Sequence, residues 1–143
     1  AGSTEDIKNE IDRMVREEKL SLKQAECIKL KDIDTFAGSS IGERIKRAYA
    51  YGGGKREQPF VFEYDRQLVQ GVIDLYFIED GQLVIVDYKT DRVLRGRAGE
   101  DELRRRYSIQ LDYYAMALSQ ITGLKVKEKV IYSFALGRSL TVE

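Results

Sequence analysis

The sequence predicts an α/β protein in which helices pack on one mixed central sheet. Three observations support this prediction. Apolar residues at helical spacing dominate the first fifty positions, three strand-like segments follow, and a long helical segment then precedes a returning strand. The length of 143 residues suits one domain that encloses one core.

The N-terminal third is expected to be helical. Ile7, Ile11 and Met14 recur at helical spacing, and Ser21 opens a Ser-Leu-Lys-Gln segment that resembles a capping box. The predicted helices cover residues 4–15, 22–30 and 41–50, with a short helical turn at 33–36. We interpret residues 1–50 as a helical lead-in segment of the same domain.

Three consecutive glycines at 52–54 mark the change from helices to strands. Pro59 is expected at the edge or start of its strand, and Asp80-Gly81 is expected to form a hairpin turn. Gly123 stands where a long helix would end. The predicted elements of this core, residues 51–143, are strands at 59–64, 67–78, 82–88, 126–136 and 140–142 and a helix at 101–121.

Two amino-acid counts restrict the possible chemistry. The single cysteine, Cys27, excludes an internal disulfide and a four-cysteine zinc or iron–sulfur site within this chain. The absence of histidine excludes Ser-His-Asp triads and histidine-ligated metals. Catalysis would rely on carboxylates, lysine, tyrosine or amides, together with a hard cation. No apolar run has the ~20 residues of a membrane helix, so the cytoplasm is the expected compartment.

The charge balance is neutral, with 24 basic and 24 acidic residues, which counts mildly against DNA binding. Basic residues nevertheless concentrate between residues 92 and 106. A phosphate-facing patch and an ordinary solvated loop and helix face are equally compatible with this run. The candidate DNA-binding residues are Arg92, Arg104, Arg105 and Arg106.

The segment 83–89 is the most informative. Residues 83–86 are apolar at consecutive positions, which predicts a central strand covered on both faces. Asp87 and Lys89 follow, and the two-residue period of a strand points them to the same face. Opposite charges at the end of a buried strand are costly unless they are paired or used. A structural Asp87–Lys89 ion pair is one interpretation, and a functional site is the other.

Asp74 lies inside another apolar run, residues 71–77, where a carboxylate needs a partner, a cation or solvent. The predicted turn at 80–81 makes the two strands antiparallel neighbours and brings Asp74 and Asp87 to similar heights. Their carboxylates repel unless a proton or a metal ion lies between them. We therefore predict a divalent cation held by both aspartates and the backbone carbonyl of Tyr88, with water and phosphate oxygens as further ligands.

Lys89 and the long helix supply the remaining candidates. Beside a cation, Lys89 would orient or help to deprotonate the attacking water, or stabilise charge on phosphate. Gln110 and Tyr114 are four residues apart, share a helix face, and can hydrogen-bond a phosphate or a nucleotide edge. The plainer interpretation is an amphipathic helix that packs on the sheet through Leu111 and Leu118.

The ordered combination of these residues resembles the RecB-type nucleases of the PD-(D/E)XK class. Within that class, the nuclease domains of AddA-type helicase–nucleases are most similar, and the match runs from about residue 41 to residue 136. The matching segments are Glu57-Gln58-Pro59-Phe60, Gly71-Val72-Ile73-Asp74, Val86-Asp87-Tyr88-Lys89-Thr90-Asp91 and Gln110-Leu111-x-x-Tyr114.

The resemblance implies a restriction-endonuclease-like fold and Mg²⁺-dependent hydrolysis of DNA, with Mn²⁺ as a possible substitute. It implies that Asp74 and Asp87 hold the metal and that Lys89 acts at the water or phosphate. Gln110 and Tyr114 would complete the site. The whole would be the exonuclease module of a bacterial double-strand-break repair machine. Its partners would be the helicase domains of its own longer chain, which alone would use ATP, together with a separate protein of the AddB type.

One departure from the family pattern concerns the metal ligands. RecB-type nucleases usually carry a histidine ligand in a Gly-Thr-x-x-His segment on an earlier helix, and this chain has no histidine. The resemblance therefore implies a fragment that begins after that helix, which by itself would bind metal weakly and cleave poorly or not at all. Glu57 also matches a family position, and a structural role is favoured for it.

Two other hypotheses stay open. A catalytically incomplete module of the same fold would dock DNA or a partner; the missing histidine favours it, whereas the intact Asp74, Asp87 and Lys89 oppose it. A purely structural domain would keep an Asp87–Lys89 ion pair without metal affinity. No Gly-x-x-x-x-Gly-Lys-Ser/Thr loop occurs, so an ATP-driven motor would lie outside this chain.

Overall fold

The computed structural model describes residues 30–143. The helix predicted over residues 4–15 lies outside this range, and so does the helix predicted over 22–30 except for its last residue. Within the described range, no helix is long and apolar enough to cross a membrane.

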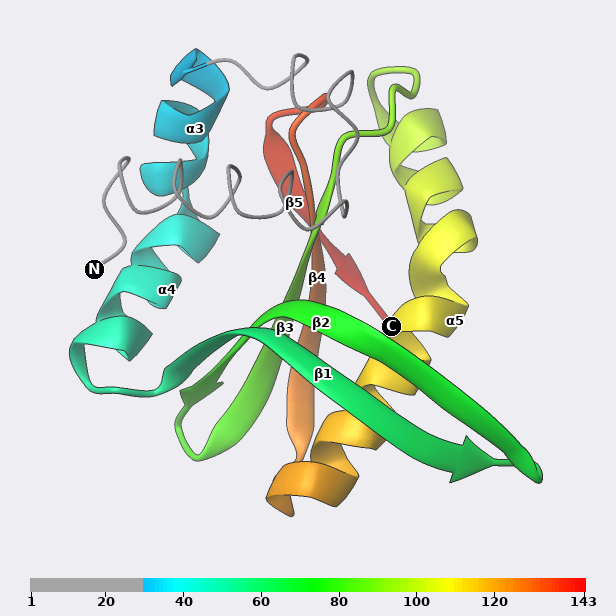
Figure 1. Ribbon diagram of the computed structural model, residues 1–143. Helices are drawn as coiled ribbons and strands as arrows, with labels where there is room; N and C mark the ends of the chain where they lie inside the picture. Colours follow the sequence, from blue (N-terminus) through cyan, green and yellow to red (C-terminus); the bar gives the residue numbers. More distant parts are fainter. Residues whose placement is uncertain (1–29) are drawn as a thin grey trace.

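Five strands form one mixed sheet in the order β1-β2-β3-β4-β5 (Figure 1). Neighbouring strands are antiparallel except β3 and β4, which run parallel because the long helix α5 connects them as a crossover. The predicted α/β class with a mixed central sheet is confirmed. The elements are α3 (Leu30–Ala37), α4 (Ser40–Ala50), β1 (Gly54–Tyr64), β2 (Gln67–Glu79), β3 (Gln82–Lys89), α5 (Arg97–Thr122), β4 (Val126–Ser133) and β5 (Arg138–Val142).

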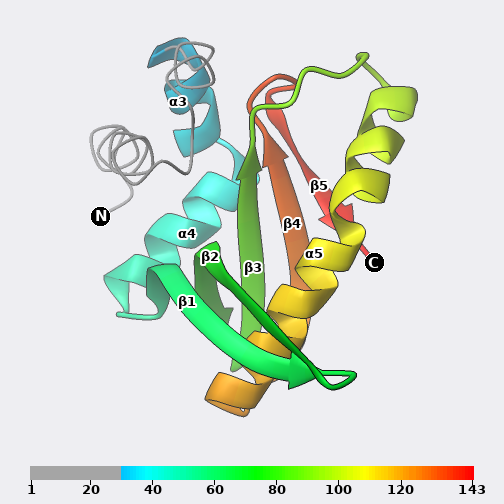
Figure 2. The same ribbon diagram turned by 45° about the vertical axis from the view of Figure 1, so that its right-hand side comes forward.

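Helices α3 and α4 cover one face of the sheet and α5 covers the other (Figure 2). Strand β3 contributes to both cores in alternation. Val84 and Val86 pack toward α3 and α4, whereas Leu83 and Ile85 pack toward α5. All four side chains are fully buried, which confirms that this strand is central and covered on both faces.

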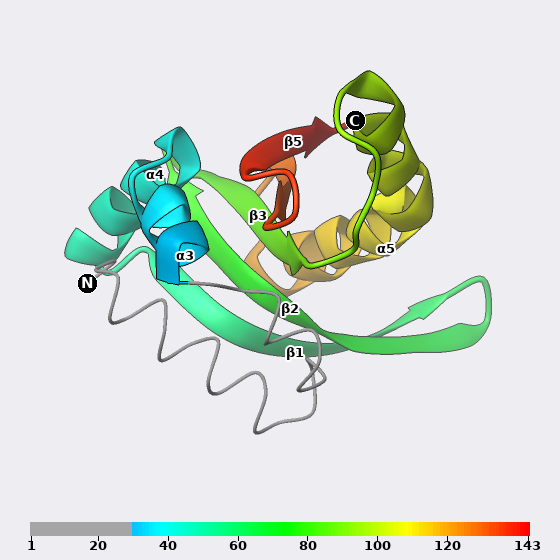
Figure 3. The same ribbon diagram turned by 90° about the horizontal axis from the view of Figure 1, so that it is seen from above.

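The β1–β2 hairpin is longer than predicted and extends past the body of the sheet (Figure 3). β1 begins at Gly54 rather than at Pro59. Within residues 30–143, β1 is an edge strand of the sheet, with β2 as its one neighbour. Pro59, which has no N–H to donate, is tolerated at such an edge, where it pairs with Val72. Within β2, the residues that pair with β3 are 75–79. The outer half of the β1–β2 hairpin, which includes Phe60 and Phe62, packs against α5.

Helix α5 begins at Arg97, four residues before its predicted start. Its N-cap is Gly96, with φ 89°, and no side chain caps this end, so the usual sequence signal of a helix start is missing. Gly99 lets the preceding loop approach the first turn, because a Cβ there would lie 1.7 Å from the Leu94 carbonyl oxygen. The helix ends at Gly123 in the left-handed conformation, as predicted.

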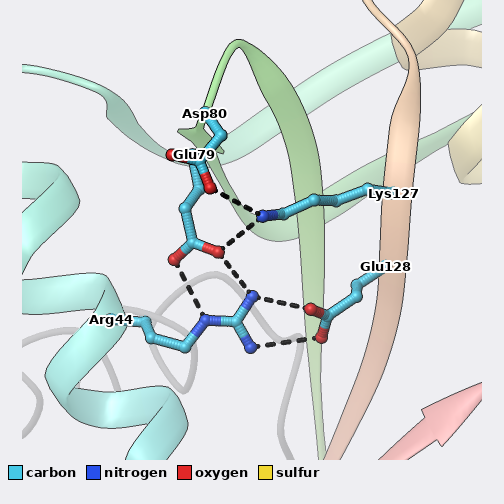
Figure 4. A network of polar contacts seen from close by, with 5 residues as sticks. All are labelled: Arg44, Glu79, Asp80, Lys127 and Glu128. Atoms are coloured by element: carbon cyan, nitrogen blue, oxygen red, sulfur yellow. Dashed lines mark hydrogen bonds and ion pairs between the residues drawn. The ribbon is translucent and has the colours of Figure 1, made fainter.

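An ion-pair network ties α4 to the sheet at the end where β3 begins (Figure 4). Arg44 donates two hydrogen bonds to Glu79, at 2.9 and 3.0 Å, and two to Glu128, at 2.8 and 3.1 Å. Lys127 Nζ lies 2.8 Å from Glu79 Oε1. These donors, Arg44 first, lower the pKa of Glu79 to about 2, although burial opposes the shift. Arg44 thus makes two parallel hydrogen bonds to each carboxylate, a bidentate arrangement that is stronger than a single hydrogen bond.

Replacing Arg44 by methionine tests the contribution of this network. We expect the free energy of unfolding at pH 7 to fall by about 1–2 kcal/mol, because two carboxylates lose their main donor. Because the pKa of Glu79 is lower in the folded chain, its ionised carboxylate stabilises the fold at pH values above the ordinary pKa of 4.5. This stabilisation is lost as the pH falls toward about 2. Urea unfolding at pH 7 and pH 3 should therefore show a smaller difference between wild type and variant at pH 3.

The matched control is Lys46→Met on the same helix. Among residues 30–143, Lys46 pairs with Glu43 alone, at 3.2 Å on the surface, so this variant should unfold like the wild type at both pH values. A difference between Arg44→Met and wild type that is equally large at pH 3 would contradict the role given to Glu79.

Candidate active site

Asp74 and Asp87 lie opposite each other where the pairing of β2 with β3 ends. The last pair of that ladder joins Leu75 to Val86, so one further step on each strand brings the two aspartates together. The side chains of Tyr76 and Ile85, next in the alternation on each strand, belong to the core beneath α5. Both aspartates therefore face α5, at the end of the sheet away from the Arg44 network.

The two carboxyl groups lie side by side, with Asp87 buried and Asp74 half-buried. Asp87 is 2% exposed, and the Asp74 carboxyl is within hydrogen-bonding distance of it. Burial, then the charge of Asp87 and the hydrogen bond with it, raise the pKa of Asp74 well above its ordinary value. The Tyr88 N–H, which donates to Asp74 Oδ2 at 3.0 Å, and the charge of Lys89 oppose this rise. Such a pair is stable when it holds a proton or a cation between its oxygens.

Lys89 extends from the end of β3 toward α5. Its Nζ lies 3.0 Å from Asp87 Oδ2 and donates to Gln110 Oε1 at 3.2 Å. It also lies 4.0 Å from the centroid of the Tyr107 ring, within cation–π distance. The lysine side chain is only 17% exposed, so these three contacts replace most of its hydration.

Helix α5 brings Gln110 and Tyr114 to the same place, one turn apart. Burial first, and then the charges of Asp87 and Asp74, raise the pKa of the Tyr114 hydroxyl, and a hydrogen bond with Gln110 opposes the shift. The hydroxyl is thus a neutral donor near two carboxylates. The Tyr114 ring packs edge-to-face on Phe60 with centroids 5.5 Å apart, so the residue also belongs to the core.

The donor atoms fit a hard divalent cation, but they do not complete its coordination. Asp87 Oδ2 is buried and, although Lys89 is close enough for an ion pair, no hydrogen-bond donor is aligned with it. Asp74 Oδ2 and the Tyr88 peptide lie beside it. Carboxylate and carbonyl oxygens are the ligands such cations prefer. Among residues 30–143, no three His, Cys, Asp or Glu side chains form a metal-binding group.

Glu57 stands at the same level of the sheet as the two aspartates. It lies between the β1–β2 pairs Arg56–Leu75 and Gln58–Ile73, opposite Asp74, and is itself left out of the ladder. Its φ of 50° is in the left-handed region, which non-glycine residues adopt rarely and often near functional sites. Nothing in the sequence around Glu57 indicates this conformation.

Tyr107 and Asp91 were given no role by the sequence, yet the structure brings both to Lys89. The Tyr107 hydroxyl donates to Asp91 Oδ2, while its ring faces the lysine. In the sequence, Tyr107 and Gln110 are three residues apart and share a helix face, and this spacing could have indicated that Tyr107 lies at the site.

The four arginines predicted to contact DNA differ in their surroundings. Arg104 and Arg106 are held in salt bridges with acidic side chains of the same chain, and Arg104 also donates to the Thr141 carbonyl. Arg105 is exposed on α5, and Arg92 lies in the loop after β3. Arg104 and Arg106 are thus bound to partners within the chain.

Relatives of this chain are found among ATP-dependent helicase/nucleases of the AddA type. The relative from Thermoanaerobacter sp. is 39% identical over 153 residues, which cover 96% of this chain and 12% of the relative. The relative from Acetivibrio thermocellus is 40% identical over 152 residues, with 95% and 12% covered. The chain therefore spans about 12% of the length of these curated relatives.

A putative exonuclease from Eubacterium rectale has a similar fold. Its crystal structure matches with a TM-score of 0.50 and 19% identity, over 99% of this chain and 59% of that chain. The model of the PD-(D/E)XK nuclease superfamily matches residues 3–140, a span that includes both aspartates, the lysine after them and the polar face of α5. This chain belongs to the PD-(D/E)XK nuclease superfamily.

Proposed function

We propose that this chain is the nuclease module of a longer helicase–nuclease and that it hydrolyses DNA phosphodiester bonds. The observation that carries the proposal is the adjacent pair of the half-buried Asp74 and the buried Asp87, with Lys89 beside it. The names of the relatives and the small share of their length support a module within a larger protein. Residues 1–50 would be its helical lead-in segment and 51–143 its core, together one domain.

Mg²⁺ is the proposed cofactor, with Mn²⁺ as a substitute, held by Asp74, Asp87 and the Tyr88 carbonyl. When bound, such a cation polarises a phosphoryl oxygen and makes a bound water more acidic. The two carboxylates exclude bulk water from one side of this position, and the Tyr88 N–H orients one of them. An earlier histidine ligand, as in related nucleases, would come from outside this chain.

Lys89 would act on the attacking water or on the charge that develops on the phosphate. Its contacts with Asp87 and Gln110 hold the ammonium at the edge of the carboxylate pair rather than in open solvent. Tyr114 is protonated at neutral pH, as the ordinary pKa of 10.0 already requires and the upward shift reinforces, so it would donate a hydrogen bond to substrate oxygen. Gln110 would align both Lys89 and Tyr114.

DNA would reach the site across the start of α5. The arginines Arg92, Arg104, Arg105 and Arg106 would contact phosphates without regard to sequence, and Arg104 and Arg106 would exchange their acidic partners for them. The proposed protein partners are the helicase domains of the same longer chain and a separate protein of the AddB type. ATP would serve those helicase domains, and the bacterial cytoplasm is the proposed location.

A catalytically incomplete docking module is the second candidate function. One observation favours it: among the described side chains only two carboxylates converge, too few for a complete set of ligands. Such a module would bind DNA with the same polar surface and leave the phosphodiester intact. If this chain is a nuclease module, changing Lys89 should reduce DNA cleavage by the longer protein. If it is a docking module, the same change should not affect cleavage.

Metal titration by calorimetry tests the carboxylate pair directly. We expect this chain to bind Mn²⁺ at one site, and Asp87→Asn to weaken that binding by about tenfold or more, because a ligand loses its charge. Asp65→Asn is the matched control, since Asp65 is exposed in the β1–β2 turn. Equal Mn²⁺ affinity in all three proteins would contradict the assignment of Asp87.

Removing one of the two charges should stabilise the metal-free chain. Asp74→Asn keeps an acceptor for the Tyr88 N–H and ends the repulsion with Asp87. We expect its free energy of unfolding in the presence of a chelator to rise by about 1 kcal/mol or more. Added Mn²⁺ should stabilise the wild type but not this variant. A variant less stable than the wild type in chelator would show that the carboxylates do not repel.

DNA cleavage by the full-length protein tests Lys89. We expect Lys89→Met to lower kcat by about 10²–10³-fold, the usual cost of removing one donor to developing charge. Lys46→Met, on the exposed side of α4, should cleave like the wild type. Mn²⁺ binding should persist in Lys89→Met, which shows that the site is intact. Unchanged cleavage in Lys89→Met would exclude its role, and an inactive wild type would favour the docking module.

A further inference from the structure

The ammonium of Lys89 has an aromatic neighbour that the proposed reaction does not require. Two of its contacts, with Asp87 Oδ2 at 3.0 Å and Gln110 Oε1 at 3.2 Å, are polar. The third is the face of the Tyr107 ring, whose centroid lies 4.0 Å from Nζ. A cation at this distance from a ring face is attracted by the ring quadrupole, more strongly where water is excluded.

The Tyr107 ring is itself fixed from the other side. Its hydroxyl donates to Asp91 Oδ2 at 2.5 Å, and Arg106 Nη1 donates to the same oxygen at 3.0 Å. Arg106 Nη2 is held in turn by Glu102 Oε1 at 2.6 Å. Burial and the hydrogen bond to Asp91 raise the pKa of Tyr107, so the hydroxyl keeps its proton and the bond persists.

These contacts form a closed loop between β3 and α5. Lys89 ends β3 and Asp91 follows two residues later, while Tyr107 is three residues before Gln110 on the same helix face. A lysine side chain has many rotamers, and restricting them costs up to about 2 kcal/mol. The ring face is apolar and carries partial negative charge, so it can contact both the methylene groups and the ammonium of Lys89. These contacts favour one orientation of the lysine side chain.

We propose that Tyr107 is a positioning residue, whose ring, fixed by Asp91, holds the Lys89 ammonium against Asp87 and Gln110 in a single orientation. The inference rests on the proposed nuclease function, because only there does the direction of the ammonium matter for a reaction. Tyr107 also packs, half-buried, against the core beneath α5. Its test therefore has to separate positioning from packing.

Tyr113 supplies the matched control for packing. It is a half-buried tyrosine of the same helix and core, but its ring contacts Phe62 and Tyr64 rather than the lysine. Tyr107→Leu and Tyr113→Leu thus remove the same ring from similar surroundings. Tyr107→Phe keeps the ring and loses only the hydrogen bond to Asp91.

NMR of the metal-free 143-residue chain with labelled lysine gives a readout that does not depend on activity. Protons of the Lys89 ε-methylene next to the ring face should resonate upfield of those of the exposed lysines. Tyr107→Leu should move them to the position of the exposed lysines, Tyr107→Phe should keep most of the shift, and Tyr113→Leu should leave it unchanged. A Lys89 resonance that is the same in Tyr107→Leu and in wild type overturns the inference.

Cleavage by the full-length protein gives the second readout. We expect Tyr107→Leu to lower kcat about tenfold with KM nearly unchanged, Tyr107→Phe to lower it less, and Tyr113→Leu to keep it. A loss confined to KM, or an equal loss in Tyr113→Leu, overturns the inference. If the Lys89 shift depends on Tyr107 while the wild type cleaves no DNA, positioning stands and the proposed function fails.

Asp91→Ala keeps the inference testable if Tyr107→Leu does not fold. This change deletes no aromatic ring; it removes the acceptor of the Tyr107 hydroxyl together with the ion pair between Asp91 and Arg106. The Lys89 ε resonances should then shift part of the way toward those of the exposed lysines, with a smaller fall in kcat than in Tyr107→Leu. Lys89 resonances and kcat that both remain as in wild type would overturn the part assigned to Asp91.

Discussion

The constraint on which the site depends is the close approach of two like charges, one buried and one half-buried, at the end of one β-ladder. Asp74 and Asp87 face each other because β2 and β3 are joined by a tight turn and keep one register from that turn outward. Such a pair is unfavourable in a dry interior. The Tyr88 N–H and the Lys89 ammonium offset part of this cost, and a shared proton or cation offsets the rest. The cost itself therefore requires either a proton or a cation at this place.

The ion pairs that anchor the sheet lie at one end of β3, and the candidate active site lies at the other. Near the beginning of β3, Arg44 and two glutamates bind α4 to the end of β2 and to the beginning of β4 (Figure 4). Along its length, β3 is buried between two cores. Only at its other end do charged side chains replace apolar ones. A strand anchored in this way can hold carboxylates in a fixed position without any contribution from flexible loops.

Helix α5 determines how these charges meet their partners. Tyr107, Gln110 and Tyr114 lie on one face over two turns; they give Lys89 a ring and an amide oxygen and place a hydroxyl near the two carboxylates. A small displacement of α5 along the sheet would change all three contacts together. The Asp91 link between loop and helix opposes such a displacement, which gives it a part in the site although it touches no proposed substrate atom.

Local periodicity and turn chemistry already determined the mixed sheet, the central strand and the meeting of Asp74 with Asp87, because these depend on near neighbours in sequence. Tertiary structure alone decided the rest. The bond between Tyr107 and Asp91 spans 16 positions, the left-handed Glu57 carries no residue signal, and α5 begins without a capping side chain. Whether an arginine such as Arg106 is exposed or paired depends on which acid the fold brings beside it, and no sequence pattern specifies that distance.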